Sequence, residues 1–265
     1  MLFGFVSGTL LLAAAHADAA FDHGHSELET LLRKHVVWIN NGHASEIDYA
    51  GIKRDRSVLK SYLAGVAAVT PQEYKGFNRN ERLAFLLNAY NAYTIDFVLT
   101  RYPKLESIRD LGTLFSSPWK KRVFPLLGEE RSLDDIEHEM IRKPGDFDDP
   151  RIHMAVNCAS VGCPALRNEA YVATRLDAQL DDAVSRFLGD RSRNRADTKG
   201  LWVSKIFDWY GGDFEKHSGS VAAWLAPHAA SLSNDPEVRA GVATASLRVR
   251  YLDYDWALND LGSSN

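Results

Sequence analysis

The chain has few cysteines and none of the sequence features that mark several common enzyme and nucleic-acid-binding classes. Only two of its 265 residues are cysteine, so at most one internal disulfide can form. It has no run of lysine and arginine longer than three residues, and its net charge of -4 gives no reason to expect nucleic acid or an anionic membrane as a partner. A glycine-rich phosphate loop, HExxH and GxSxG are all missing, so nucleotide binding and the common zinc and serine hydrolases have no support. We expect no cofactor and no metal, and we expect any ligand to be a small molecule or a peptide.

The first 19 residues have most of the pattern of an export signal. Leu2 to Ala15 form an uncharged run, and small-x-small cleavage sites end at Ala17 and Ala19. The basic residues that usually precede such a run are missing, and the run is too short to span a bilayer stably. We expect a signal peptide at residues 1–19, a periplasmic or secreted location, and no transmembrane segment after its removal. No Asn-x-Ser/Thr sequon occurs, which favours a bacterial periplasm over a eukaryotic secretory route.

The rest of the chain, residues 20–265, is predicted to form one α+β domain. Its composition is that of an ordinary globular protein, 45% hydrophobic and 25% charged, without repeats or a low-complexity linker. Helical and strand-like segments alternate irregularly, which favours several helices packed on a small mixed or antiparallel sheet. Ser132 followed by Asp135 predicts a capped helix start. We expect residues 21–25 to form a frayed tail after the signal.

Residues 80–101 are predicted to form the most buried helix. Between Leu83 and Ile95 there is no charged residue. Asn88 and Asn91 are three residues apart and therefore lie on one face of this helix. A buried amide needs hydrogen-bond partners, or it costs about 1–3 kcal/mol. These two amides either fix neighbouring loops or point into a site, where they would orient a catalytic group or a substrate.

The segment RIHMAVNCASVGCPAL, residues 151–166, contains both cysteines and is the centre of the candidate site. Apolar residues at 152, 154 and 156 alternate with His153, Ala155 and Asn157, which predicts a strand. Gly162 and Pro164 then predict a sharp turn after Cys158.

One interpretation makes Cys158 the nucleophile of a thiol-dependent hydrolase or acyl transferase. A thiolate needs a nearby imidazolium or backbone amides aimed at the sulfur. His153 is the histidine closest in sequence, and His217 is the alternative base. Asn88 or Asn91 would orient that histidine, as an amide does in some thiol proteases.

A second interpretation pairs Cys158 with Cys163 in a disulfide that shapes a binding or structural loop of a non-catalytic exported protein. Two cysteines five residues apart in an exported chain favour such a bond. A redox role is a variant of this interpretation, although CxxxxC lacks the tight spacing of CxxC redox pairs. His153 with both cysteines would give three zinc ligands, but no fourth is suitably spaced.

The chain resembles the family named domain of unknown function 547 in an ordered set of motifs. These are LLNAYNAY (86–93), SLDDIEHEMIR (132–142), DPRIHMAVNCASVGCPAL (149–166), SKIFDWYGGDF (204–214) and DYDWALN (253–259). The resemblance extends over residues 77–259 and implies a mixed α/β fold in which the segment around Cys158 is a shared feature. It implies no reaction, because the family is defined without an activity.

Overall fold

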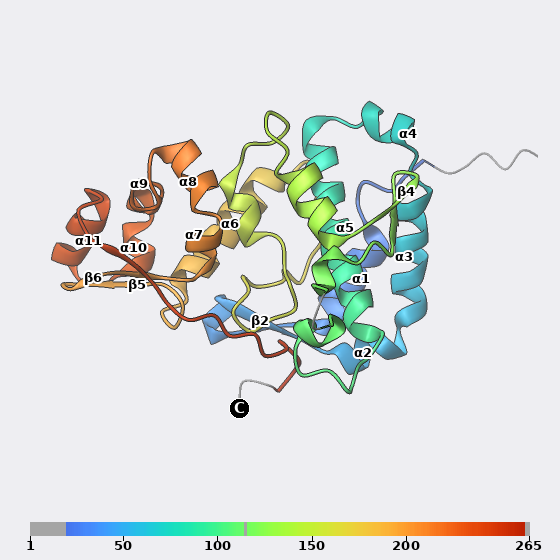
Figure 1. Ribbon diagram of the computed structural model, residues 1–265, viewed down its shortest axis with the longest axis horizontal. Coiled ribbons are helices and arrows are strands. Elements are labelled where there is room, and N and C mark those ends of the chain that lie inside the picture. Colours follow the sequence, from blue (N-terminus) through green and yellow to red (C-terminus); the bar gives the residue numbers. More distant parts are fainter. Residues whose placement is uncertain (1–19, 114–115, 263–265) are drawn as a thin grey trace, which may run out of the picture.

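The computed structural model describes residues 20–113 and 116–262, so the predicted signal peptide at 1–19 lies outside them. The N-terminal helices are α1 (Ser26–His35), α2 (Tyr49–Arg54), α3 (Arg56–Ala68), α4 (Pro71–Gly76) and α5 (Arg79–Leu99). The C-terminal helices are α6 (Leu176–Gly189), α7 (Ile206–Trp209), α8 (Gly211–Ser218), α9 (Val221–Leu225), α10 (Ala229–Leu232) and α11 (Pro236–Ala243). The two groups form the two ends of an elongated molecule, and the cysteine segment runs between them (Figure 1).

The strands lie in small separate sheets among the described residues. They are β1 (Val36–Ile39), β2 (Ala44–Ile47), β3 (Phe124–Leu126), β4 (Glu129–Arg131), β5 (Arg195–Asp197), β6 (Gly200–Val203) and β7 (Val249–Tyr251). β1 with β2 and β3 with β4 form antiparallel pairs, whereas β6 is antiparallel to β5 and parallel to β7. The predicted α+β class is therefore confirmed. Short helical turns lie at Asn40–Gly42, Ile108–Leu111, Pro118–Lys120, Pro150–Met154 and Ala226–His228, and a π-helical segment lies at Asp135–Ile141.

Helix α5 is the centre of the larger hydrophobic core. Asn78 and Glu81 form a reciprocal capping box at its start, which satisfies backbone N–H groups that the helix leaves open. Every residue from Leu83 to Leu99 is buried. The helix contacts α2, α3 and the π-helical segment, and the prediction for residues 80–101 is confirmed. None of the helices in the described parts of the chain combines the length and hydropathy needed to cross a membrane.

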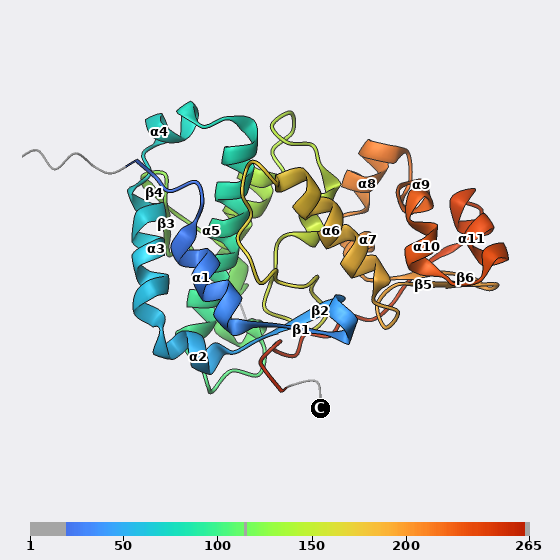
Figure 2. The same ribbon diagram turned by 180° about the vertical axis from the view of Figure 1, so that it is seen from behind.

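A second hydrophobic cluster lies among α6–α11 and β6. Phe187, Phe207, Phe214 and Trp224 are at its centre, and the Phe214 and Trp224 rings are 4.8 Å apart. The chain after β7 then returns across the molecule toward β2, as both views show (Figures 1 and 2). This return brings the last residues against the cysteine segment.

The strand predicted from Arg151 to Asn157 is wrong. Residues 150–154 form a 3₁₀ turn, which the Asp149 side chain caps by accepting from the Arg151 N–H. The alternation of apolar and polar residues predicted a strand with one side facing solvent. The polar residues do not face solvent, since His153 and Asn157 are 2% and 4% exposed. Both sides of the segment are covered, so the period of two carried no information about its conformation.

The frayed tail predicted at residues 21–25 is also wrong. His25 is 1% exposed and its Nδ1 lies 2.7 Å from the Tyr62 hydroxyl. The Phe21 ring packs edge-on against Phe85, with centroids 5.1 Å apart. Burial lowers the pKa of His25 to about 4, because the charged imidazolium loses its hydration.

His25 makes stability depend on pH in a defined window. Between pH 6.5 and 4 the unfolded chain binds a proton at this imidazole that the folded protein excludes, so stability falls as pH falls. We expect the free energy of unfolding, measured by urea titration, to fall between pH 7 and pH 4 by roughly 2–3 kcal/mol more in the wild type than in the His25→Gln variant. Replacing the exposed His217 by Gln is the control and should retain the wild-type slope. Parallel curves for His25→Gln and the wild type would contradict this account.

Candidate functional site

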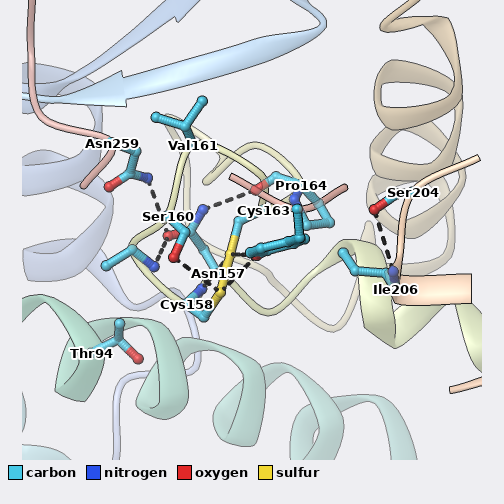
Figure 3. Close-up of a disulfide and its surroundings, with 12 residues drawn as sticks. Thr94, Asn157, Cys158, Ser160, Val161, Cys163, Pro164, Ser204, Ile206 and Asn259 are labelled. Carbon is cyan, nitrogen blue, oxygen red and sulfur yellow. Dashed lines mark hydrogen bonds between the residues drawn. A yellow bond between two sulfur atoms is a disulfide. The ribbon is translucent and has the colours of Figure 1, made fainter. Parts of the chain in front are cut away.

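Cys158 and Cys163 form a disulfide, with Cα atoms 6.3 Å apart. The predicted pairing is therefore present, and Figure 3 shows the bond inside a tight loop. Both cysteines of the chain are used, so a nucleophilic role for Cys158 requires reduction of this bond first.

The loop is fastened to helix α5 by one amide. The Asn91 Nδ2 donates to the carbonyl of Ala155 at 3.0 Å, and its Oδ1 accepts from the backbone N–H of Asn157 at 2.8 Å. The Asn157 side chain adds two more hydrogen bonds within the loop. It donates to the Pro164 carbonyl and accepts from the Ala159 N–H. These bonds satisfy the polar groups of a buried segment that has no regular structure.

Asn88 does the same for a different segment. Its amide donates to the Tyr171 carbonyl at 2.7 Å and accepts from the Tyr171 N–H at 2.9 Å. Both amides of α5 thus bond to backbone, which matches the loop-fixing alternative. Among the described residues neither amide is hydrogen-bonded to a histidine.

The returning C-terminal segment packs directly on the cysteine loop. The N–H of Val161 donates to the Ala257 carbonyl at 2.8 Å, and that of Gly162 to the Asp255 carbonyl at 2.9 Å. A Cβ on Gly162 would lie 2.9 Å from both the Asp255 oxygen and the Tyr254 ring. Glycine is required here because the two backbones approach too closely for any side chain.

The close packing of the C-terminal segment on the cysteine loop places the Tyr254 hydroxyl beside both sulfurs of the disulfide. Its oxygen is 3.1 Å from the Cys158 sulfur and 3.0 Å from the Cys163 sulfur. Burial raises the pKa of Tyr254 well above its usual value, so the hydroxyl keeps its proton and donates it to sulfur.

The disulfide forms part of the wall of a pocket of about 180 Å³. Six tyrosines and tryptophans from four separate parts of the chain line it: Tyr90, Trp119, Trp209, Tyr210, Tyr254 and Trp256. Ser117, Asp134, Glu137, His138 and His153 supply its polar part. No cluster of metal-binding side chains occurs in the described ranges of the chain.

Glu137 is a buried carboxylate with an unused oxygen. It is 4% exposed, and its Oε1 has no hydrogen-bond partner. Burial raises the pKa values of the Tyr90 and Tyr210 hydroxyls, and the Glu137 charge and side-chain hydrogen bonding to Glu137 raise them further. The sequence prediction missed Glu137, although it is the central residue of a buried i, i+4, i+8 stripe with Leu133 and Ile141.

His153 lines the same pocket, and its partner is Asp213. Its Nε2 is 2.8 Å from the Asp213 Oδ2, and Arg142 holds both carboxylate oxygens of Asp213 at 2.7 and 3.0 Å. The bond from His153, followed by that from Arg142, holds the pKa of Asp213 below its usual range. Burial lowers the pKa of His153, so its ring is neutral, Nε2–H donates to Asp213, and Nδ1 carries a lone pair without a partner.

His217, the alternative base, lies elsewhere. It is exposed on α8, its Nδ1 is 2.9 Å from the Ser218 hydroxyl, and it lines a separate cavity with Asp148 and Asp149. The structure therefore brings His153 and Cys158 to one pocket and leaves His217 outside it.

The two asparagines of α5 allow a matched test of this arrangement. We expect Asn91→Ala and Asn88→Ala each to lower the free energy of unfolding by about 2–4 kcal/mol. Each substitution leaves one buried backbone donor and one buried backbone acceptor without a hydrogen-bond partner. Only Asn91→Ala should speed amide hydrogen exchange at residues 155–164, measured by mass spectrometry. Equal exchange in this segment for both variants would show that Asn91 does not hold the loop.

The comparisons agree with the motifs and add no activity. The family described as "Protein of unknown function, DUF547" matches residues 74–188, whereas no curated protein and no solved structure matches the chain. The matched residues include Asn91, Glu137, His153 and the disulfide loop, but the motifs at 204–214 and 253–259 lie beyond them. The chain is thus similar to the DUF547 family over the segment that contains the disulfide and the buried acceptors of the pocket.

Proposed function

We propose that this chain is an exported binding protein whose ligand is a small organic cation with an apolar body. The observation that supports this proposal most directly is a pair of buried acceptors without partners, Glu137 Oε1 and His153 Nδ1, on residues that line one pocket. An unmade buried hydrogen bond costs about 1–3 kcal/mol, and more for a charged group. A ligand that brings N–H donors recovers this free energy.

The aromatic wall fits the same ligand class. The Trp256 ring is surrounded by Tyr254, Trp119 and Trp209, with centroid distances of 4.5, 5.7 and 5.6 Å. The Arg109 guanidinium also lies over this ring, 5.3 Å from its centroid, and shows that the ring accepts a cation. Indole faces attract an ammonium or guanidinium group and also stack on an apolar body. The pocket therefore offers both kinds of surface that an organic cation needs.

The charge of the pocket favours a cation over an anion. Asp134 and Glu137 line it, and none of the described lining residues is lysine or arginine. The neighbouring Arg142 is occupied by Asp213, so it does not offer a free positive charge to a ligand. An anionic ligand would meet two carboxylates in a partly desolvated space, where repulsion is strong.

The thiol-hydrolase alternative has less support. Such an enzyme needs a free Cys158 thiolate beside an imidazole. Cys158 is bridged to Cys163, and no hydrogen bond among the described residues joins its sulfur to a histidine. In the proposed function the disulfide shapes the wall of the pocket.

A series of three phenyl compounds tests the ligand class. By isothermal titration calorimetry at pH 7, we expect phenethylamine to bind more tightly than 2-phenylethanol, and phenylacetate to bind least. Glu137→Gln should weaken phenethylamine binding about ten- to a hundredfold, because it removes a charge-assisted hydrogen bond.

Glu139→Gln is the matched control for this test. Glu139 lies on the same π-helical segment, but its side chain is 65% exposed, so its removal should leave phenethylamine affinity unchanged. Equal affinity for phenylacetate, or an unchanged affinity in Glu137→Gln, would overturn the proposal.

A further inference from the structure

We propose that the Cys158–Cys163 disulfide is a thiol–disulfide exchange site, at which a small thiol attacks Cys158 and Cys163 leaves. This activity does not require the proposed cation binding, although both use the same pocket, so a thiol without carboxylates is the suitable reactant. Both cysteines line the pocket, but their exposure differs: Cys158 is half-buried, whereas Cys163 is 4% exposed. An incoming thiolate therefore reaches the Cys158 sulfur more easily.

Hydrogen-bond donors are directed at the sulfur that would leave. The backbone N–H of Cys158 donates to the Cys163 sulfur at 3.0 Å. The Tyr254 hydroxyl is 3.0 Å from the same sulfur and keeps its proton because it is buried. Donors to a sulfur stabilise the thiolate that forms there, and a better-stabilised leaving thiolate departs faster.

A third group, the Arg193 guanidinium, fixes the backbone of the leaving cysteine. The Arg193 guanidinium donates to the carbonyl of Cys163 and, at 3.1 Å, to that of Val161. Asp190 holds this arginine in place through an ion pair of 2.5 Å, which partly offsets its charge. Arg193 therefore contributes mainly by keeping Cys163 in position beneath the two donors.

The exchange balances with two equivalents of an external thiol. A thiolate RS⁻ attacks the Cys158 sulfur, the Cys158–Cys163 bond breaks, and its electron pair leaves on Cys163. The product is a mixed disulfide at Cys158 and a thiolate at Cys163. A second thiolate then attacks the R sulfur, which releases RSSR and the reduced Cys158; a proton is taken up at each cysteine thiolate that becomes a thiol.

The loop from Cys158 to Cys163 has contacts that hold its position when the disulfide is reduced. Asn91 and Asn157 hold it to helix α5, and Val161 and Gly162 pair with the C-terminal segment, all without using the disulfide. The bond spans five residues, a short loop whose closure constrains the unfolded chain only modestly. The reduced pocket therefore remains assembled.

Trapping identifies the attacked sulfur directly. Oxidised, folded protein is treated with 2-mercaptoethanol, which carries no carboxylate, then quenched with N-ethylmaleimide and mapped by mass spectrometry. We expect mercaptoethanol on Cys158 and maleimide on Cys163 in the trapped intermediate. Mercaptoethanol on Cys163, or no reaction unless denaturant is added, would overturn the proposal.

Two tyrosine variants test the leaving-group argument. Tyr254→Phe should slow reduction by 2-mercaptoethanol about three- to tenfold, because one donor to the leaving thiolate is lost. Tyr251→Phe on β7 is the control, since Tyr251 is 40% exposed and is not hydrogen-bonded to either sulfur. Circular dichroism establishes that both variants are folded. A Tyr254→Phe rate equal to the wild-type rate would refute the role of this hydroxyl.

Discussion

The hydrogen bonds from the Asn91 amide to the cysteine segment are the constraint on which the rest of the site depends. They join the most buried helix to residues 155–157, a segment without regular secondary structure. A buried backbone of this kind is stable only if its N–H and C=O groups find partners. Asn91 and Asn157 supply several of these partners, and the position of the disulfide follows from them.

The cysteine loop, held in this position, forms part of the wall of the pocket. Tyr90 comes from α5, Glu137 from the π-helical segment, Trp209 from the end of α7, and Tyr254 and Trp256 from the returning C-terminal segment. These parts are far apart in the sequence, and their side chains line one pocket beside the disulfide. A π-helical segment is uncommon, and here it contains a buried carboxylate at the pocket.

The buried acceptors of the pocket without hydrogen-bond partners lower the stability of the folded protein. Glu137 and His153 each keep one polar atom without a partner, although the neighbouring Asn88, Asn91 and Asn157 are bonded at both ends of their amides. Local departures from complete hydrogen bonding tend to occur at functional sites. Buried polar atoms without a partner also occur away from the pocket, for example at Ser45, Tyr171 and Trp202. Glu137 and His153 differ from these because both line one pocket, and this is the physical basis of the proposed binding site.

The sequence by itself determined the features that depend on neighbours along the chain. The apolar run of α5 and the cap formed by Ser132 and Asp135 are where local patterns placed them, and the proximity of the two cysteines allowed their pairing. The tertiary structure alone decided what depends on distant residues. Asp213 pairs with His153 across 60 residues, and Tyr254 reaches Cys158 across 96. The strand prediction at 151–157 failed for the same reason: alternation reports burial on one side of a segment, and packing from other parts of the chain buried both.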